Sequence, residues 1–188
     1  MATSDVQICS NALLLLGAQT INDFDEEADR ALIVSNLWPN ARDAVLRSHP
    51  WNCAKERVLL APDASPPAFG FSYQFALPGD CLRVLALGEE GESFRFRVAR
   101  RRILMDESEC RLEYIFRNED VTTWDSLLVT AMEAYMAMVA AYPITKSATT
   151  RDAMKDLYAF QLRQARTVDA LEEPTEDVGD TPFLAVRR

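Results

Sequence analysis

Histidine and glycine are scarce in this sequence, and each shortage excludes a kind of site. His49 is the only histidine among 188 residues, so motifs that hold a metal ion with two histidines are impossible. The six glycines are scattered singly, so there is no glycine-rich loop to hold a phosphate. Four cysteines stand far apart without a C-x-x-C pair, which excludes a zinc knuckle and favours reduced, buried thiols: Cys9, Cys53, Cys81 and Cys110. We expect no metal ion and no cofactor.

Positive charge and long apolar runs are lacking as well. The chain has 20 Lys and Arg residues against 29 Asp and Glu residues, a formal net charge of −9. Holding duplex DNA regardless of its sequence needs an excess of positive charge, so we do not expect the whole surface to bind DNA, although a basic stripe can lie inside an acidic total. No stretch approaches about 18 apolar residues, and no basic segment followed by an apolar run opens the chain. We therefore expect neither a membrane span nor secretion.

Residues for nucleophilic catalysis are sparse. A serine or cysteine nucleophile needs a base, usually histidine, and His49, directly before Pro50 and Trp51, is the one candidate. We interpret His49 as a structural side chain at a helix end. The acidic residues between Asp23 and Asp29 are typical of a solvated face and contain no calcium-loop motif. We expect no enzymatic activity.

Helical spacing of apolar residues marks both ends of the chain. Ser4 and Gln7 have the spacing of a helix N-terminal cap, and Gly17 stands where a left-handed C-terminal glycine belongs. A second helical region covers residues 32–46, where Pro39 predicts a kink or a new helix start. Helical spacing returns near residue 123; Pro143 is expected to stop that helix, and a last helix runs to residue 173.

The middle of the chain has the alternating pattern of strands. Apolar residues recur at every second position, or form short runs, in residues 73–77, 82–87, 94–98 and 112–116, with turn residues between them. This predicts an antiparallel sheet of about four to six strands between residues 57 and 117. We therefore predict an α+β fold: residues 1–56 and 119–173 form helical hairpins that share one bundle, 57–118 form an inserted antiparallel β-rich module, and 174–188 form an extended arm.

The sharpest charge feature lies in the β-rich module. Strand spacing predicts that Phe94, Phe96 and Val98 point inward, with Arg95 and Arg97 outward. We call the five arginines of this stretch the basic ridge: Arg95, Arg97, Arg100, Arg101 and Arg102. Three readings stay open, namely contact with an acidic partner, contact with a phosphate backbone, or a solvated face balanced by neighbouring glutamates.

The last residues form an apolar segment beyond an acidic linker. Such a segment either inserts into a partner or neighbouring subunit, or is a frayed terminus. The residues that would carry such a contact are Pro182, Phe183, Leu184, Val186, Arg187 and Arg188.

Four segments, in order along nearly the whole chain, resemble the tail tubular protein A family, the head-to-tail adaptor proteins of short-tailed bacteriophages and related prophages. They are residues 8–17 with Ile21, residues 41–54, residues 73–84, and residues 143–147 with the helix over 157–173. The most specific motifs are R-D-x-x-L-R-x-H-P-W at residues 42–51 and L-P-x-D-C-L-R-V at residues 77–84.

The resemblance implies a structural virion protein without catalytic activity. Such adaptors form a ring, commonly of twelve copies, between the portal protein and the tail tube or nozzle protein, and DNA passes through the ring without sequence-specific binding. The expected location is the neck of the virion, and the host cytoplasm during assembly. The resemblance favours the C-terminal segment as an arm that docks on the portal. The alternative is a nucleic-acid-binding protein that uses the basic ridge.

Overall fold

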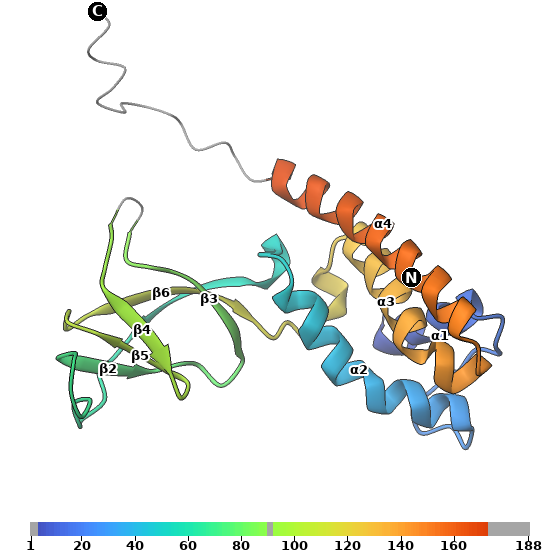
Figure 1. The fold of residues 1–188 in the computed structure, drawn as a ribbon, viewed down its shortest axis with the longest axis horizontal. Helices are drawn as coiled ribbons and strands as arrows, with labels where there is room; N and C mark the ends of the chain where they lie inside the picture. The colour runs from blue at the N-terminus through green and yellow to red at the C-terminus, as the bar shows by residue number, and fades with distance from the viewer. Residues whose placement is uncertain (1–3, 90–91, 173–188) are drawn as a thin grey trace, which may run out of the picture.

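A computed structural model describes residues 4–89 and 92–172, which fold into two lobes lying end to end (Figure 1). The helical bundle contains α1 (Asp5–Leu15), α2 (Asp29–Arg47), α3 (Ser126–Thr145) and α4 (Ala148–Glu172). The β lobe is inserted between α2 and α3, and short 3-10 turns at Asn52–Ala54 and Val121–Thr123 lie where the chain enters and leaves it. The predicted α+β class, with a bundle built from both ends of the chain, is confirmed.

The first helix has the caps that the sequence predicts. The Ser4 hydroxyl oxygen accepts a hydrogen bond from the backbone N–H of Gln7 at 3.1 Å. Gly17 has a φ of +70°, and the N–H groups of Gly17 and Ala18 donate to the carbonyls of Leu14 and Leu13. These two bonds satisfy carbonyls that the helix end would otherwise leave free, and only glycine adopts that φ without strain.

Two prolines are tolerated inside helices. Pro39 lies within α2, which is continuous from Asp29 to Arg47. The prediction that Pro143 stops its helix is wrong, because α3 continues to Thr145 and ends where Lys146 takes a left-handed conformation with φ +55°. Both helices contribute buried side chains to the shared core, and this packing outweighs the hydrogen bond that each proline removes.

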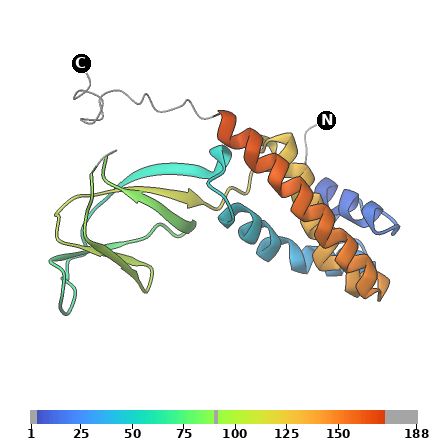
Figure 2. The same cartoon turned by 45° about the horizontal axis from the view of Figure 1, so that its top comes forward.

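The centre of the bundle is α3, which packs against α1, α2 and α4 (Figure 2). Its buried residues are mainly alanine and methionine, with Leu128. By length and composition α3 also qualifies as a membrane span, since a window within its 20 residues has a mean hydropathy of 1.5. From the sequence alone we expect no such stretch. The burial of its side chains against three helices is the arrangement of a central bundle helix.

The β lobe contains two antiparallel three-stranded sheets rather than one sheet. The first has the order β1-β6-β3, with β1 (Lys55–Leu60), β6 (Cys110–Phe116) and β3 (Cys81–Leu87). The second has the order β2-β5-β4, with β2 (Tyr73–Ala76), β5 (Arg102–Met105) and β4 (Phe96–Ala99). Alternation along single strands cannot reveal which strands pair, so the sequence pattern missed the division.

Each lobe has its own apolar core. The β-lobe core contains residues from both sheets, such as Phe75, Ile103 and Leu112. The bundle core contains Trp51 and Ile115, which belong to the entry and exit segments of the β lobe, and Leu82 and Leu85 of β3 pack against it. The β1-β6-β3 sheet is therefore the sheet that is attached to the bundle.

Candidate functional site

Polar contacts gather where the two lobes meet. We call this set of ion pairs and hydrogen bonds the interlobe joint. Its members are Arg42, Asp43, Arg47, Ser48, His49, Asn52, Leu82, Arg83, Arg117, Glu119, Arg166 and Asp169.

One half of the joint surrounds the carboxylate of Asp43 on α2. Arg117, directly after β6, donates from Nε to both carboxylate oxygens of Asp43 at 2.8 and 3.1 Å. Arg42, of which only 9% is exposed, donates to the same carboxylate at 3.1 Å and pairs with Glu119 at 3.0 Å. Charge-assisted hydrogen bonds of this kind are shorter and stronger than neutral ones. They hold the exit of the β lobe against α2.

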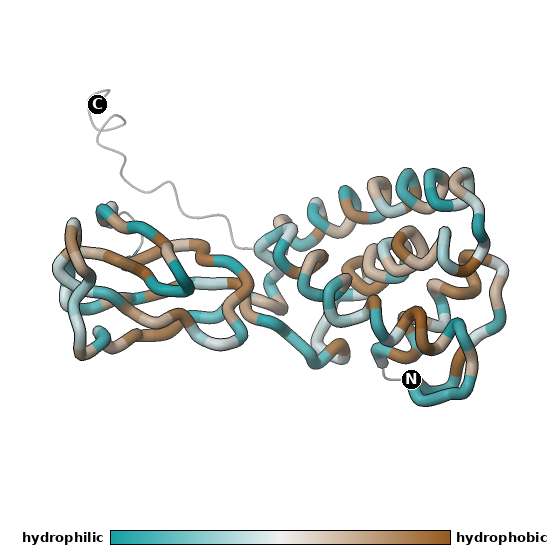
Figure 3. Tube along the Cα trace, turned by 60° about the horizontal axis from the view of Figure 1, so that its bottom comes forward, coloured by the Kyte–Doolittle hydropathy of each residue, from teal (hydrophilic) through white to brown (hydrophobic). Residues whose placement is uncertain are grey.

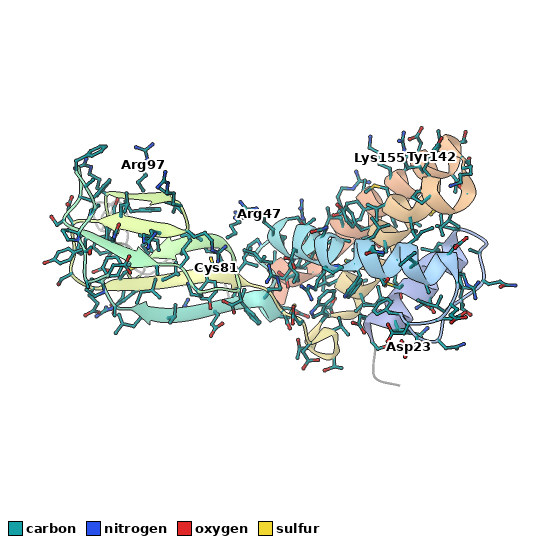
Figure 4. The ribbon with its side chains drawn as sticks, turned by 90° about the horizontal axis from the view of Figure 1, so that it is seen from below. Asp23, Arg47, Cys81, Arg97, Tyr142 and Lys155 are labelled. Atoms are coloured by element: carbon teal, nitrogen blue, oxygen red, sulfur yellow. The ribbon has the colours of Figure 1, made fainter. Side chains whose placement is uncertain are left out.

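A second contact joins the end of α2 to β3. Arg47, the last residue of α2, lies between the lobes and donates to the carbonyl of Leu82 (Figure 4). In return, Arg83 donates to the carbonyl of Arg47 at 3.4 Å. Arg47 comes from the first of the two specific sequence motifs, and Leu82 and Arg83 come from the second. The structure thus brings the two motifs together.

The other half of the joint surrounds Asp169 on α4, which is 8% exposed. Its carboxylate lies 3.1 Å from Nε2 of His49 and accepts a hydrogen bond from the backbone N–H of Asn52 at 3.0 Å. The Asn52 side chain donates to the carbonyl of Asp169 at 2.9 Å. Arg166, one turn earlier, donates to the carbonyl of Ser48 at 2.9 Å. These bonds fasten the C-terminal helix to the segment that enters the β lobe.

His49 therefore lies in a structural contact. Its ring meets Trp51 edge-to-face at 4.6 Å between centroids. Burial lowers the pKa of His49 from its ordinary value of 6.5 and outweighs the neighbouring Asp169 carboxylate, which raises it. In the part of the chain that the structure describes, no hydroxyl or thiol is hydrogen-bonded to His49.

The arginines of the basic ridge have different environments. Arg100 and Arg101 form the two-residue turn between β4 and β5, with φ values of +49° and +57°. Asn and Gly are the usual residues in such a turn, because side chains disfavour positive φ. Arg101 compensates by donating to the carbonyls of Pro78 and Gly79 at 2.6 and 3.2 Å. These hydrogen bonds from the Arg101 guanidinium thus stabilise the turn before β3.

Two further ridge arginines pair within the β lobe. Arg102 forms an ion pair with Asp63 at 2.8 Å. Arg95 lies 4.7 Å above the ring of Phe71 and 3.8 Å from the Asp106 carboxylate.

The side chains of Arg97 and Arg100 contact no other charged group among the described residues, and Arg97 projects from the surface (Figure 4). Among the described residues, Arg97 and Arg100 are thus the ridge arginines whose side chains have neither an ion pair nor a hydrogen bond.

The apolar residues beside the ridge point inward as predicted, but they are only partly buried. Phe96 and Val98 pair with the buried Met105 and Ile103, so they do lie on the core face of their sheet. They are nevertheless 45% and 46% exposed, because β4 is an edge strand and nothing described covers that part of the face. Phe94 precedes β4 and is half-buried against the β-lobe core. The alternation of apolar residues predicts the face of the sheet on which a side chain lies, whereas the burial of that side chain depends on the strands beside it.

The remaining candidates are the acidic residues between Asp23 and Asp29 and the cysteines. The acidic residues between Asp23 and Asp29 line an open hollow of about 390 Å³ with Phe24 and Leu32. Among residues 4–89 and 92–172, no group of three metal-ligating side chains comes together. Burial raises the pKa of Cys9 to about 12 and that of Cys53 and Cys110 to about 11, so these thiols stay protonated and unreactive.

Some surface features were not singled out from the sequence. Phe69, in the loop between β1 and β2, is 86% exposed, and Phe160 and Leu171 on α4 are 48% and 78% exposed. Apolar residues in a loop or in a helical stripe give no signal of exposure, because the sequence does not say what covers them. The predicted arm, with Pro182, Phe183, Leu184, Val186, Arg187 and Arg188, lies outside the described residues.

Comparison with known proteins adds nothing to the site. A scan against protein-family models found no match, and a search of curated proteins found none either.

Asp43→Ala tests the joint. The substitution leaves Arg117 without its carboxylate and the buried Arg42 with Glu119 alone. We expect the free energy of unfolding, measured by urea denaturation, to fall by about 1–3 kcal/mol. The control is Asp156→Ala, since Asp156 is exposed on α4 and has no side-chain partner among the described residues. Equal stability of the two variants would contradict the role of Asp43.

The titration of His49 tests the other half of the joint. Because it is the only histidine, one imidazole signal in the proton NMR spectrum reports its pKa, which we expect below 6.5. The unfolded chain then takes up the proton first, so the free energy of unfolding should fall as the pH falls through 6.5. Asp169→Asn should lower the pKa further, because the carboxylate raises it. A pKa at or above 6.5 in the unmodified chain would contradict this burial.

Proposed function

We propose that this protein is a structural component of a bacteriophage virion, a head-to-tail adaptor whose copies form a ring between the portal and the tail tube or nozzle. One observation carries the proposal. The two sequence motifs on which the resemblance depends contact each other, since Arg47 and Arg83 each donate to the backbone of the other motif. The residues of these two motifs thus have a structural role, which is what we expect of a protein that assembles into a virion.

The exposed apolar residues support ring formation. A closed ring needs two different faces on each subunit, one to meet the next copy and one to receive the previous copy. The helix α4 packs on one side of α3 (Figure 3). It exposes Phe160, Val168 and Leu171. On the other side, α1 and α2 expose Leu14 and Leu32. The contact of two such faces would bury apolar side chains that water now surrounds.

The charge balance is compatible with a channel through which DNA slides. A net charge of −9 per copy disfavours a tight grip on phosphates at short range, where salt screens least. The same balance weakens the alternative of a nucleic-acid-binding protein, because among the described residues three of the five ridge arginines already have a partner. In the adaptor, the C-terminal arm that contains residues 182–188 is the portal contact.

Native mass spectrometry of the chain mixed with the portal protein of its own phage or prophage tests the proposal. We expect a portal-bound ring of the chain. Phe160→Asp with Val168→Asp should abolish the ring while the helical circular dichroism stays unchanged, because two charges cannot be buried in an apolar contact.

The matched control places the same charges elsewhere on α4. Ala159 and Ala170 are exposed and lie about a quarter of a turn from Phe160 around the helix, so Ala159→Asp with Ala170→Asp should still form the ring. Absence of any portal complex with the unmodified chain would refute the adaptor. Steep salt-dependent DNA binding that Arg97→Ala with Arg100→Ala removes would favour the alternative.

A further inference from the structure

The outer edge of β4 has unpaired backbone groups. In a two-residue hairpin, the residues that flank the turn form a hydrogen-bonded pair, here Ala99 and Arg102, and bonded pairs alternate along the strand. Arg97 is therefore bonded to β5 as well, whereas Phe96 and Val98 direct their N–H and C=O groups away from β5. The described residues contain no other backbone bond to Phe96 or Val98. Such an edge is a template for one more strand.

The side chains along this edge indicate what kind of segment fits it. Phe96 and Val98 present about half of their surface on the core face, which favours an apolar strand beside them. Arg100 lies in the turn after β4, whereas Arg97 is the second residue of β4, and neither has a partner among the described residues. Glu92 is exposed just before β4 at the other end. A fitting strand is apolar in the middle, acidic where it meets Arg100, and basic where it meets Glu92.

The C-terminal residues of the chain have this pattern. Residues 172–180 contain five carboxylates, from Glu172, Glu173, Glu176, Asp177 and Asp180. The next residues are apolar, from Phe183 to Val186, and Arg187 and Arg188 end the sequence. Running antiparallel to β4, this segment would bring its acidic part to Arg100, beyond the end of β4, and its two arginines toward Glu92. Pro182, which has no N–H, would stand at the start of the added strand, a position that tolerates proline.

We propose that residues 181–188 of the same chain add to the edge of β4 as an antiparallel strand in the free subunit, and that residues 173–180 bind Arg100. The attachment point makes this possible. Asp169 of α4 is bonded to Asn52, three residues before β1, so α4 ends beside the root of the β lobe. Eight residues, 173–180, span up to about 26–29 Å when extended. The seven-residue strands of the lobe are about 24 Å long.

This inference stands without the proposed function. It assigns to the segment a place in the free subunit, which the segment would leave in order to dock on a portal. Strand addition supplies main-chain hydrogen bonds and also covers an edge that would otherwise promote aggregation. The test uses the free chain, so its failure leaves the adaptor proposal untouched.

Amide exchange measured by NMR on the full-length, ¹⁵N-labelled chain tests the added strand. We expect the outward amides of Phe96 and Val98 to exchange at least about tenfold more slowly than in Leu184→Asp with Val186→Asp, which changes only the segment. Arg100→Glu should lose part of the same protection, because the new carboxylate repels the acidic residues that precede the added strand. Lys155→Glu, an equal charge change on an exposed residue of α4, should keep it. The inward amides of residue 97 and Ala99 report that the hairpin remains folded.

Three outcomes would overturn the inference. Exchange of the Phe96 and Val98 amides at the rate of an open strand in the unmodified chain means that the edge is free. Protection that decreases on tenfold dilution means that the segment, or the edge, of a second copy covers β4. Protection that persists in Leu184→Asp with Val186→Asp means that another part of the molecule is the occupant.

Discussion

The carboxylate of Asp169 is the point on which the arrangement of the chain depends. It lies on the last helix, is nearly inaccessible to water, and binds both His49 and the backbone of Asn52 at the entrance to the β lobe. A buried carboxylate without such partners would be strongly unfavourable. Because its partners belong to the segment between α2 and β1, the C-terminal helix and the middle of the sequence are fixed together. At the exit of the β lobe, the contact between Asp43 and Arg117 likewise fixes α2 to the segment that follows β6.

This joint matters because the two lobes have separate cores. The bundle core reaches the β lobe through Trp51 and Ile115, whereas the core between the two sheets is built from β-lobe residues alone. Two such bodies connected only by two chain segments would move relative to each other. The polar contacts add directional constraints on either side of the apolar contact, so the chain is held as one elongated body. The proposed ring would need such a rigid subunit.

Local signals in the sequence were the reliable ones. The caps of α1 follow from Ser4 and Gly17, since side-chain hydrogen bonding and φ preference act within a few residues. The sequence predicts that Pro143 ends its helix, but tertiary packing extends α3 past this proline. The division into two sheets, and the exposure of Phe96 and Val98, depend on which strands become neighbours. The sequence identifies the arginines of the basic ridge, but the hydrogen bond from Arg101 to the Pro78 carbonyl depends on the fold.

Part of the interlobe joint lies in the two sequence motifs, residues 42–51 and 77–84, yet only the structure reveals that the motifs meet. Residual dipolar couplings of backbone amides in the aligned, full-length chain test the central claim, that the joint makes one rigid body of two lobes. We predict that a single alignment tensor fits the amides of the helices and of the strands together. Two tensors of different magnitude, one for each lobe, would contradict it.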